Sequence, residues 1–304
     1  MNIRQLRCVC EVVRHDMNVS RAAASLHSSQ PAVSTQIHRL EAELGFEIFV
    51  RRRNRLTALT ANGKAIFDRA KRALLEIEGI HEIRREHLRD DTGTLVVAAS
   101  HGQSRNVLPA AMKRFSRRFP KVEVTVRHGT RKQIADMLLG GEAHVGLTSD
   151  VSELGERLLL LPCHRYRRIV LVPHKHSLLK RGRPTLAALA EYPFVLYEPS
   201  GSAGPVANAF AERGVELRQI LFAPNSDVMK AYVEQGLGIT ALAEFMFDER
   251  RDKSLRAIDA SHLFPPSVTY LLLVRKQYLR SYTYAFLEEI SPRLTRTMVE
   301  EAIG

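Results

Sequence analysis

Cysteines and long apolar runs are both scarce in this chain, and their scarcity limits the classes of protein to which it can belong. The 304 residues include three cysteines, Cys8, Cys10 and Cys163. This odd, sparse set fits a reducing cytoplasm and argues against structural zinc. The longest apolar runs fall far short of the roughly 20 residues that span a bilayer. Charges occur throughout residues 1–20, so we expect no secretory signal peptide and a cytoplasmic protein that does not enter membranes.

Common enzyme motifs are also missing. The sequence has no P-loop, no dinucleotide-binding fingerprint and no GxSxG nucleophile elbow. Serine, histidine and aspartate are plentiful, but no local context arranges them as a catalytic triad. His174 and His176 could be drawn as a metal pair, yet two loop histidines without a third ligand nearby are usually surface residues. We therefore expect no catalytic residue, no bound metal and no cofactor.

Basic residues, by contrast, are in excess. The formal net charge is +12, and residues 1–89 carry half of that excess in less than a third of the chain. A basic surface suits a nucleic-acid partner, although charge alone predicts only non-specific attraction. The chain is long enough for two or three domains, and with 45% hydrophobic residues it can form real cores.

Two short helices joined by a polar turn are predicted over residues 20–45. Ser20 is expected to cap the first helix, because its hydroxyl can accept an unpaired backbone N–H. Ser29 is expected to cap the second helix, with Pro31 in the first turn, where the missing N–H does no harm. Apolar residues of the second helix recur at steps of four, three and four from Val33 to Leu44, which predicts one buried face.

The opposite face of this second helix carries small polar and amide side chains. A helix that is held by one apolar face and is polar on the other suits insertion into a DNA major groove. The alternative is an ordinary helical hairpin with a solvated outer face. The predicted DNA contacts of the two helices are Ser20, Ser29, Gln30, Pro31, Ser34, Thr35, His38 and Arg39.

An arginine cluster follows the two helices directly. Residues 51–72 contain eight basic residues and one acidic residue. A basic run alone is usually a solvated face. Behind a reader helix, however, guanidinium groups can hold phosphates or enter a minor groove, as the wing of a winged helix-turn-helix does. The predicted wing contacts are Arg51, Arg52, Arg53 and Arg55.

These features resemble the DNA-binding domain of LysR-type transcriptional regulators. The resemblance lies in four segments, IRQLRCVCEVV, SRAAASLHSSQPAVSTQIHRLEAELG, FEIFVRR and LTALTANG. It implies an N-terminal all-α winged helix-turn-helix domain over residues 1–59, which binds double-stranded promoter DNA and controls the recruitment of RNA polymerase. Thr35 departs from the pattern, because many members carry lysine or arginine there. Because of this difference, we expect DNA binding to depend less on a contact at Thr35 and more on the wing.

Residues 60–90 are predicted to form one long linker helix. Thr60 is a suitable N-cap, and the following segment contains no proline. Its apolar residues recur at the heptad spacing of a coiled-coil seam. The helix could instead lie on its own domain, but it is longer than so small a domain can cover. We therefore predict dimerisation through a seam of Ile66, Ala70, Ala73, Ile77 and Ile80.

Residues 91–304 alternate β-branched runs with helical stretches, which predicts an α/β domain. Two subdomains joined by two crossovers resemble the periplasmic-binding-protein-like effector domain of the same family. Subdomain I is expected over about 91–163 and 266–304, and subdomain II over about 164–265. Strands are expected at 94–100, 121–129, 143–149, 166–173, 193–198, 219–225 and 267–276, and helices at 106–119, 130–141, 204–214, 226–236 and 281–294.

Hydroxyl and amide side chains follow predicted strands or begin predicted helices at 100–103, 148–149 and 200–204. The strand ends of such folds meet at a cleft, and ligands bind there. Unpaired N–H groups at helix starts carry partial positive charge and hold anions without a full countercharge. The serines could instead be simple helix caps. We predict a site for a small oxyanion or a compact polar metabolite.

Several segments of the whole chain resemble the CysB/Cbl branch of the family, whose members regulate sulfur assimilation and sulfonate use. The segments are HxQxRxxLP at 101–109, LLPCHRYRR at 160–168, YPFVLYE at 192–198, SDVMKAYVEQGLG at 226–238 and LRSYTYAFLEEISPRLT at 279–295. The resemblance implies a homodimer or homotetramer with an effector of the sulfate, acetylserine or adenylyl sulfate type in the cleft. Threonines of the branch pocket align with Ser100, Ser149 and Ser202, while Gln103 is retained and the aromatic residue that follows Pro-Cys in the branch falls at Tyr166.

The preferred function is therefore a sequence-specific transcriptional regulator of sulfur-metabolism genes. One alternative is a LysR-type regulator of another pathway with a different small-molecule effector. A cytoplasmic solute-binding protein would not need a reader helix, and an architectural DNA-binding protein would not need a cleft fold. The predicted effector contacts are Ser100, His101, Gly102, Gln103, Thr148, Ser149, Tyr166, Gly201 and Ser202.

Overall fold

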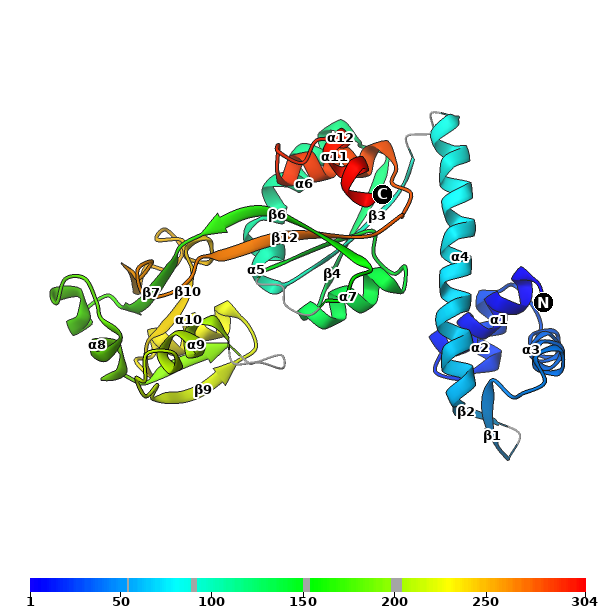
Figure 1. Cartoon of the computed structure of the whole chain (residues 1–304), viewed down its shortest axis with the longest axis horizontal. Helices are drawn as coiled ribbons and strands as arrows, with labels where there is room; N and C mark the ends of the chain where they lie inside the picture. The colour runs from blue at the N-terminus through cyan, green and yellow to red at the C-terminus, as the bar shows by residue number, and fades with distance from the viewer. Residues whose placement is uncertain (54, 89–91, 150–153, 198–203) are drawn as a thin grey trace. The chain divides into compact units, whose positions relative to one another are not determined.

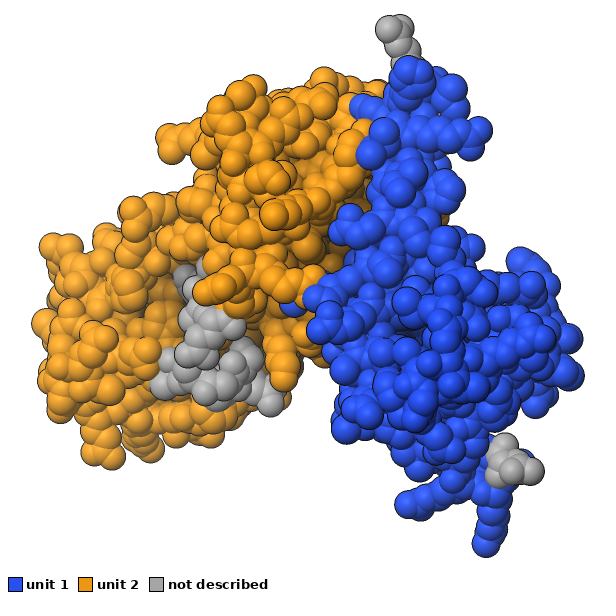
Figure 2. All heavy atoms as spheres, turned by 45° about the vertical axis from the view of Figure 1, so that its right-hand side comes forward, with its two compact units in different colours: residues 1–90, 139–142 blue, residues 91–138, 143–304 orange. Residues whose placement is uncertain are grey.

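The computed structural model describes residues 1–53, 55–88, 92–149, 154–197 and 204–304. The chain divides into two compact units, which Figure 2 shows in different colours. The N-terminal unit comprises residues 1–90 with 139–142, and the C-terminal unit comprises 91–138 and 143–304. Within the described ranges, no helix combines the length and the apolar character that crossing a membrane requires.

The N-terminal unit is a helical domain with a small β-hairpin. Its elements are α1 (Ile3–Arg14), α2 (Val19–Ser25), α3 (Gln30–Leu44), β1 (Phe49–Arg52), β2 (Arg55–Leu59) and α4 (Ala61–His87). Strands β1 and β2 pair antiparallel, so the winged domain contains one two-stranded sheet besides its helices. The largest buried side chains of its core are Ile37, Leu40, Ile48 and Phe49.

The two caps predicted at Ser29 and Thr60 are confirmed. The Ser29 hydroxyl accepts a hydrogen bond from the backbone N–H of Ala32 at 3.4 Å, and Pro31 lies in the first turn of α3. The Thr60 hydroxyl accepts from the N–H of Gly63 at 2.9 Å and begins α4. Both caps satisfy donors that the first turn of a helix leaves unpaired.

The cap predicted at Ser20 is wrong. Helix α2 begins at Val19, and the side chain of Asn18 caps it by accepting from the N–H of Arg21 at 3.0 Å. The chain reaches this cap through Asp16 and Met17, whose φ angles of 52° and 65° make a tight left-handed turn. Because that turn places the cap at Asn18, Ser20 lies within the helix with its side chain at the surface.

The hairpin is held to α3 by one buried carboxylate. Only 7% of the Glu41 side chain is exposed. Its Oε1 accepts from the backbone N–H of Ile48 at 2.8 Å and from that of Phe49 at 3.3 Å. Its Oε2 accepts from the Nη2 of Arg51 at 2.5 Å. The Nη1 of Arg51 also donates to Oε1, at 3.3 Å. Glu41 therefore fixes the start of the hairpin relative to α3, because four hydrogen bonds end on this one carboxylate.

The burial of apolar side chains on helix α4 decreases along its length. Its first half packs on α1 and contributes Ile66, Phe67 and Ala70 to the core of the unit, and Figure 1 shows the helix continuing beyond α1. Farther along, Ile80 is 66% exposed and Ile83 is 51% exposed. Large apolar side chains at this exposure favour burial against another surface.

Subdomain I of the C-terminal unit is built on one mixed sheet of order β4-β3-β5-β12-β6. Its strands are β3 (Gly93–Ala99), β4 (Val122–His128), β5 (Val145–Ser149), β6 (Leu158–Tyr166) and β12 (Ser267–Val274). Strand β3 pairs parallel with β4 and β5, whereas β12 runs antiparallel to β5 and β6. The associated helices are α5 (His101–Asn106), α6 (Leu108–Arg118), α7 (Arg131–Leu139), α11 (Ser281–Ile290) and α12 (Arg296–Ile303).

Subdomain II contains a three-stranded antiparallel sheet and a parallel pair. Its strands are β7 (Arg168–Pro173), β10 (Thr240–Ala243), β11 (Leu255–Asp259), β8 (Phe194–Tyr197) and β9 (Gln219–Ala223). A bridge between Phe194 and Ile239 joins the pair to the sheet. Its helices are α8 (Leu186–Ala190), α9 (Pro205–Ala211) and α10 (Ser226–Glu234), with short 3₁₀ turns η1 (Ser177–Lys180) and η2 (Glu244–Met246).

The predicted fold class is confirmed, with two α/β subdomains that the chain crosses twice (Figure 1). Strand β6 leads into β7, and β12 returns to the first sheet. Strands β6, β10 and β11 and helices α8 and α12 were not predicted. In β6, Pro162 is tolerated because this edge strand pairs only with β12, so one side of its ladder needs no N–H donors. The helix predicted at 106–119 is α6, with Pro109 in its first turn, whereas the short helix α5 that precedes it was not predicted.

Replacing Glu41 tests its role as an anchor. Glu41→Ala should lower the local opening free energy of the hairpin by about 2 kcal/mol, because two buried N–H groups and Arg51 lose their acceptor. Hydrogen exchange of peptides covering β1 and β2 measures this change. Glu43→Ala on the same helix, at an exposed site, is the matched control. Equal exchange in the two variants would contradict the anchor.

Candidate functional site

The polar face predicted on α3 lies at the surface of the N-terminal unit. Val33, Ile37 and Leu40 are buried beneath it. The side chains of Gln30, Pro31, Thr35, His38 and Arg39 are exposed, and that of Ser34 is half-buried. The Thr35 hydroxyl donates to the carbonyl oxygen of Pro31 at 2.8 Å, so it turns back onto its own helix.

One hydrogen bond links α2 to the start of this face. The Ser20 hydroxyl donates to Oε1 of Gln30 at 3.0 Å, and both side chains are exposed. This hydrogen bond assigns the orientation of the Gln30 amide. The amide oxygen points toward α2, and the Nε2 group points away from α2. An amide with a free donor edge is the group that pairs with acceptors on a base.

The wing arginines occupy two different environments. Arg51 is held in ion pairs with Glu41 and with Glu47, the latter at 3.6 Å, and only 24% of its side chain is exposed. Arg52, Arg53 and Arg55 are exposed at the tip of the β1–β2 hairpin. Their guanidinium groups are therefore free to meet an anionic partner in solution, whereas that of Arg51 already has one.

A buried amide lies where three strands of subdomain I meet. Gln103 on α5 follows β3 by four residues and is fully buried. Its Nε2 donates to the Ser149 hydroxyl at 2.7 Å and to the Thr269 hydroxyl at 2.8 Å. Ser149 ends β5, and Thr269 on β12 is its register partner. The Gln103 cluster, which we define as Gln103, Ser149 and Thr269, thus joins residues far apart in the sequence.

The Gln103 cluster has hydrogen-bonding capacity left over. Among the described residues, Gln103 Oε1 is buried without a hydrogen-bond partner. Leaving such an acceptor unpaired costs on the order of 1–3 kcal/mol. The Ser149 hydroxyl accepts from Gln103 and keeps its own hydrogen to donate, and its side chain is half-buried. A polar ligand reaching this point would find both a donor and an unpaired acceptor.

Other predicted effector contacts fall in different places. Ser100 and His101 are half-buried and Gly102 is buried, all at the start of α5 beside Gln103. Side chains alternate along a strand, so the buried Thr148 points to the opposite face of the sheet from Ser149. Gly201 and Ser202 lie outside the described residues.

Tyr166 lies at the end of β6, where the chain leaves subdomain I. Its ring packs against Phe245 of subdomain II at a centroid distance of 4.4 Å and against His164 at 5.9 Å. Burial raises the pKa of the Tyr166 phenol, so the hydroxyl stays protonated at neutral pH. This ring is therefore an uncharged aromatic contact between the subdomains.

A charged cluster that sequence reasoning missed joins α5 to α10. His101 Nε2 donates to Asp227 Oδ2 at 2.7 Å, and Arg105 forms an ion pair with Asp227 Oδ1. Lys230 lies 3.4 Å from Asp227 and 3.0 Å from Asp252. Burial, then Arg105 and Lys230, lower the pKa of His101, so its ring is neutral at neutral pH. The only sequence signal was that Asp227 and Lys230 lie in the segment SDVMKAYVEQGLG.

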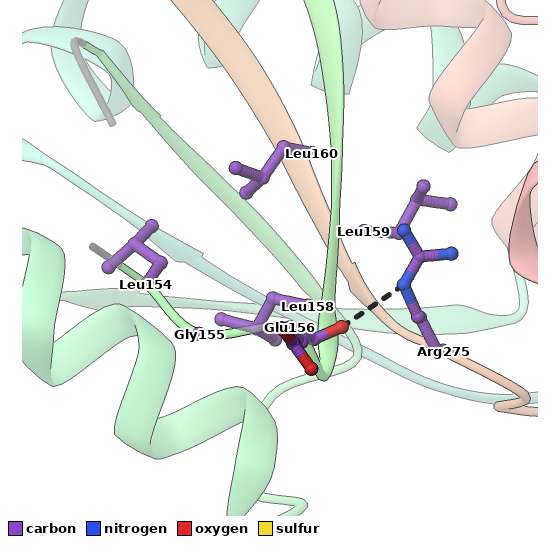
Figure 3. Close-up of a pocket in the computed structure, with 7 residues that line it drawn as sticks. All are labelled: Leu154, Gly155, Glu156, Leu158, Leu159, Leu160 and Arg275. Atoms are coloured by element: carbon purple, nitrogen blue, oxygen red, sulfur yellow. Dashed lines mark hydrogen bonds between the residues drawn. The ribbon is translucent and has the colours of Figure 1, made fainter. Parts of the chain in front are cut away.

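A separate hollow of about 750 Å³ opens near the start of β6 (Figure 3). Leucine side chains and Arg275 line it, and Arg275 Nε donates to the carbonyl oxygen of Glu156 at 3.1 Å. No predicted effector contact lines it. Strand β6 ends at Tyr166, about 25 Å farther along at the usual rise per residue, so the hollow is distant from that end of the strand. Its lining residues are Leu154, Gly155, Glu156, Leu158, Leu159, Leu160 and Arg275.

Known transcriptional regulators are similar to this chain. The HTH-type transcriptional regulator CysB of Burkholderia cenocepacia is 39% identical over 304 residues, which cover 100% of this chain and 97% of that protein. The regulator SsuR of the same organism is 39% identical over 300 residues, covering 98% and 97%. The crystal structure of the cofactor-binding domain of the Cbl transcriptional regulator covers 70% of this chain and 94% of its own, with 34% identity and a TM-score of 0.66.

Two family models match consecutive parts of the chain. The bacterial regulatory helix-turn-helix protein, lysR family, matches residues 3–64, and the LysR substrate binding domain matches residues 89–295. These relatives and families are transcriptional regulators and not enzymes, as the missing enzyme motifs predicted. The chain belongs to the LysR family of bacterial transcriptional regulators.

Proposed function

We propose that this protein is a sequence-specific regulator of sulfur-metabolism genes, controlled by a small anionic or polar effector bound at the Gln103 cluster. The observation that carries the proposal is the buried amide of Gln103, one end of which is unpaired and which lies beside two hydroxyl groups that can donate. Relatives named CysB and SsuR, 39% identical over nearly the whole chain, support the sulfur pathway.

The chemistry of the Gln103 cluster suits an oxyanion. Ser149 and Thr269 accept from Gln103, and the half-buried Ser149 can donate its hydrogen to a ligand. If the amide turns over, Oε1 accepts from the two hydroxyls and Nε2 becomes the donor. Either arrangement offers neutral donors, which recognise sulfate-sized groups by directed hydrogen bonds. Ser100, His101 and Gly102 belong to the proposed site, as do Tyr166 and Ser202 by resemblance and Gly201 by its place beside Ser202 in the sequence. Thr148, which points to the opposite face of the sheet from Ser149, is left out of it.

Helix α3 and the wing make different contacts with DNA under this proposal. The exposed face from Gln30 to Arg39 reads bases in the major groove, aided by Ser20 and Ser29 at the helix start. Arg52, Arg53 and Arg55 hold phosphates or enter the minor groove. Arg51 contributes by anchoring the hairpin to Glu41, and its partly exposed guanidinium adds to the local positive field.

Control by the effector follows from two states of the subdomains. A ligand can shift an equilibrium only to the extent that it binds the two states unequally. We infer that effector binding favours one arrangement of the subdomains. This arrangement changes how homodimers, paired as homotetramers, bend promoter DNA and recruit RNA polymerase in the cytoplasm.

A LysR-type regulator of another pathway is the second candidate. Serines at 100 and 149, where the sulfur-related branch has threonines, leave space for a larger ligand. Calorimetry of the full chain against sulfate, thiosulfate, acetylserine and adenylyl sulfate distinguishes the two candidates. Binding of one of these compounds supports the sulfur pathway, and binding of none supports the second candidate.

Arg52→Ala tests the wing. The variant should bind all duplex sequences more weakly and reduce the slope of log affinity against log salt by about one, because one phosphate contact is lost. Fluorescence anisotropy of a labelled promoter duplex at several salt concentrations measures both effects. Arg250→Ala, at an exposed site of the C-terminal unit, removes the same charge and should leave the slope unchanged. An unchanged slope in Arg52→Ala would contradict the wing assignment.

Ile80→Glu tests dimerisation through α4. The exposed apolar side chain should be buried in a two-stranded seam, so a carboxylate there would be desolvated and would weaken the dimer. Sedimentation velocity over a range of protein concentrations should show dissociation to smaller species. His81→Glu, exposed on the same helix, is the control and should keep the native assembly. If Ile80→Glu sediments like the control, the seam lies elsewhere.

Gln103→Ala tests the effector site. Loss of the amide removes the Nε2 donor that organises the two hydroxyls, so sulfate affinity should fall at least about tenfold. Calorimetry of the full chain measures the affinity, and circular dichroism confirms that the variant is folded. Asp136→Asn, at an exposed site on α7, is the control. A folded Gln103→Ala variant with native sulfate affinity would disprove this site.

A further inference from the structure

One carboxylate connects the two subdomains beside the Gln103 cluster. Asp227 is the second residue of α10 in subdomain II, and its backbone N–H donates to the capping oxygen Oδ1 of Asn225 at 3.1 Å. The same oxygen accepts from Val228 at 3.0 Å. These bonds hold the start of α10 rigid, so the position of the Asp227 carboxylate is fixed by subdomain II.

Two side chains of subdomain I reach this carboxylate, and both come from α5. His101 Nε2 donates to Oδ2 at 2.7 Å, and the guanidinium of Arg105 pairs with Oδ1. Because a carboxylate only accepts, the neutral ring of His101 must carry its hydrogen on Nε2. The two contacts are one helical turn apart, so they hold α5 at two points along its length.

The same short helix carries the effector site. Gln103 lies between His101 and Arg105 in a helix of six residues. Gly102 packs against Met246 of subdomain II so closely that an added Cβ would lie 2.8 Å from the Met246 Cε. A movement of α5 that accompanies ligand binding therefore acts directly on contacts with subdomain II.

The neighbouring charged residues leave Asp227 available for its bridge to α5, by which we mean its contacts with His101 and Arg105. Lys230, one turn along α10, is buried and makes hydrogen bonds to both carboxylate oxygens of Asp252, at 3.0 and 3.1 Å. It also donates to the carbonyl oxygen of Met246 at 3.1 Å. Since Asp252 compensates Lys230, the charge of Asp227 is balanced chiefly by Arg105 across the subdomain boundary.

We propose that Asp227 is a positioning residue that transmits effector occupancy from α5 to subdomain II through His101 and Arg105. This inference rests on the proposed effector site, because it makes α5 the element that the effector orders. With the bridge intact, a ligand that fixes Gln103 also fixes the position of α10. Without the bridge, the ligand orders α5 alone, and closing of the subdomains no longer contributes to its affinity.

A double-mutant cycle on the full chain tests the coupling. Sulfate is the probe, and calorimetry measures its affinity for the native protein, His101→Ala, Asp227→Ala and the double variant. We expect Asp227→Ala to weaken sulfate binding about tenfold and His101→Ala to weaken it less, because the ion pair of Arg105 with Asp227 remains. The double variant should be little weaker than Asp227→Ala, since that change already removes the contact with His101. Asp227→Asn keeps an acceptor for His101 but loses the charge that pairs with Arg105, so its affinity should be intermediate.

A matched control and a second measurement distinguish the proposed coupling role of Asp227 from a purely structural one. Glu234→Gln removes one charge from an exposed site on the same helix and should bind sulfate normally. Hydrogen exchange without ligand should be faster at α5 in Asp227→Ala than in Glu234→Gln. Native sulfate affinity in Asp227→Ala, or a double variant weakened by the product of the single effects, would overturn the proposal.

Failure of the effector assignment gives a different pattern. If the native protein itself does not bind sulfate, or Gln103→Ala binds it normally, the proposed site is wrong. In that case, only hydrogen exchange at α5 tests whether Asp227 bridges the subdomains. Faster exchange at α5 in Asp227→Ala supports a subdomain bridge at Asp227, and exchange equal to that of Glu234→Gln overturns it.

Discussion

The return of β12 to the first sheet is the constraint on which the C-terminal unit depends. By pairing with both β5 and β6, this strand closes a discontinuous subdomain and sets Thr269 opposite Ser149. That register gives the buried amide of Gln103 its two hydroxyl partners. A shift of one residue would turn Thr269 to the other face of the sheet and leave Gln103 without one of them. The polar cluster is therefore a product of strand register and not of local sequence.

The N-terminal unit uses a buried carboxylate for a similar purpose. Glu41 projects from α3 and holds the start of the hairpin through two backbone N–H groups and Arg51. Glu41 thus holds the hairpin in place against α3, and under the proposed function such pre-organisation lowers the ordering cost of DNA binding. In both units, a buried polar side chain, Glu41 in one and Gln103 in the other, holds together groups from separate elements.

Local patterns of the sequence were sufficient for most helices and for the reader face of α3. Caps, a helical period and a short basic hairpin are encoded within a few neighbouring residues, as Ser29, Thr60 and Arg52 illustrate. Long-range features were not predictable. Thr269 reaches Gln103 across 166 residues, and Asp227 reaches His101 across 126. The partner of Arg51 was missed for the same reason, because Glu41 reads in the sequence as an ordinary helix-surface acid, and Asn18 displaced Ser20 through a turn with positive φ.

Under the proposed function, the N-terminal unit recognises one DNA site, and a small anion bound in the C-terminal unit changes how the protein binds that site. DNase I footprinting of the full chain on DNA upstream of sulfur-assimilation genes, with and without sulfate or acetylserine, tests this claim most directly. The account predicts a single bounded site whose protected length changes when one of these compounds is added. Protection spread evenly along the DNA, unaltered by either compound, would contradict it.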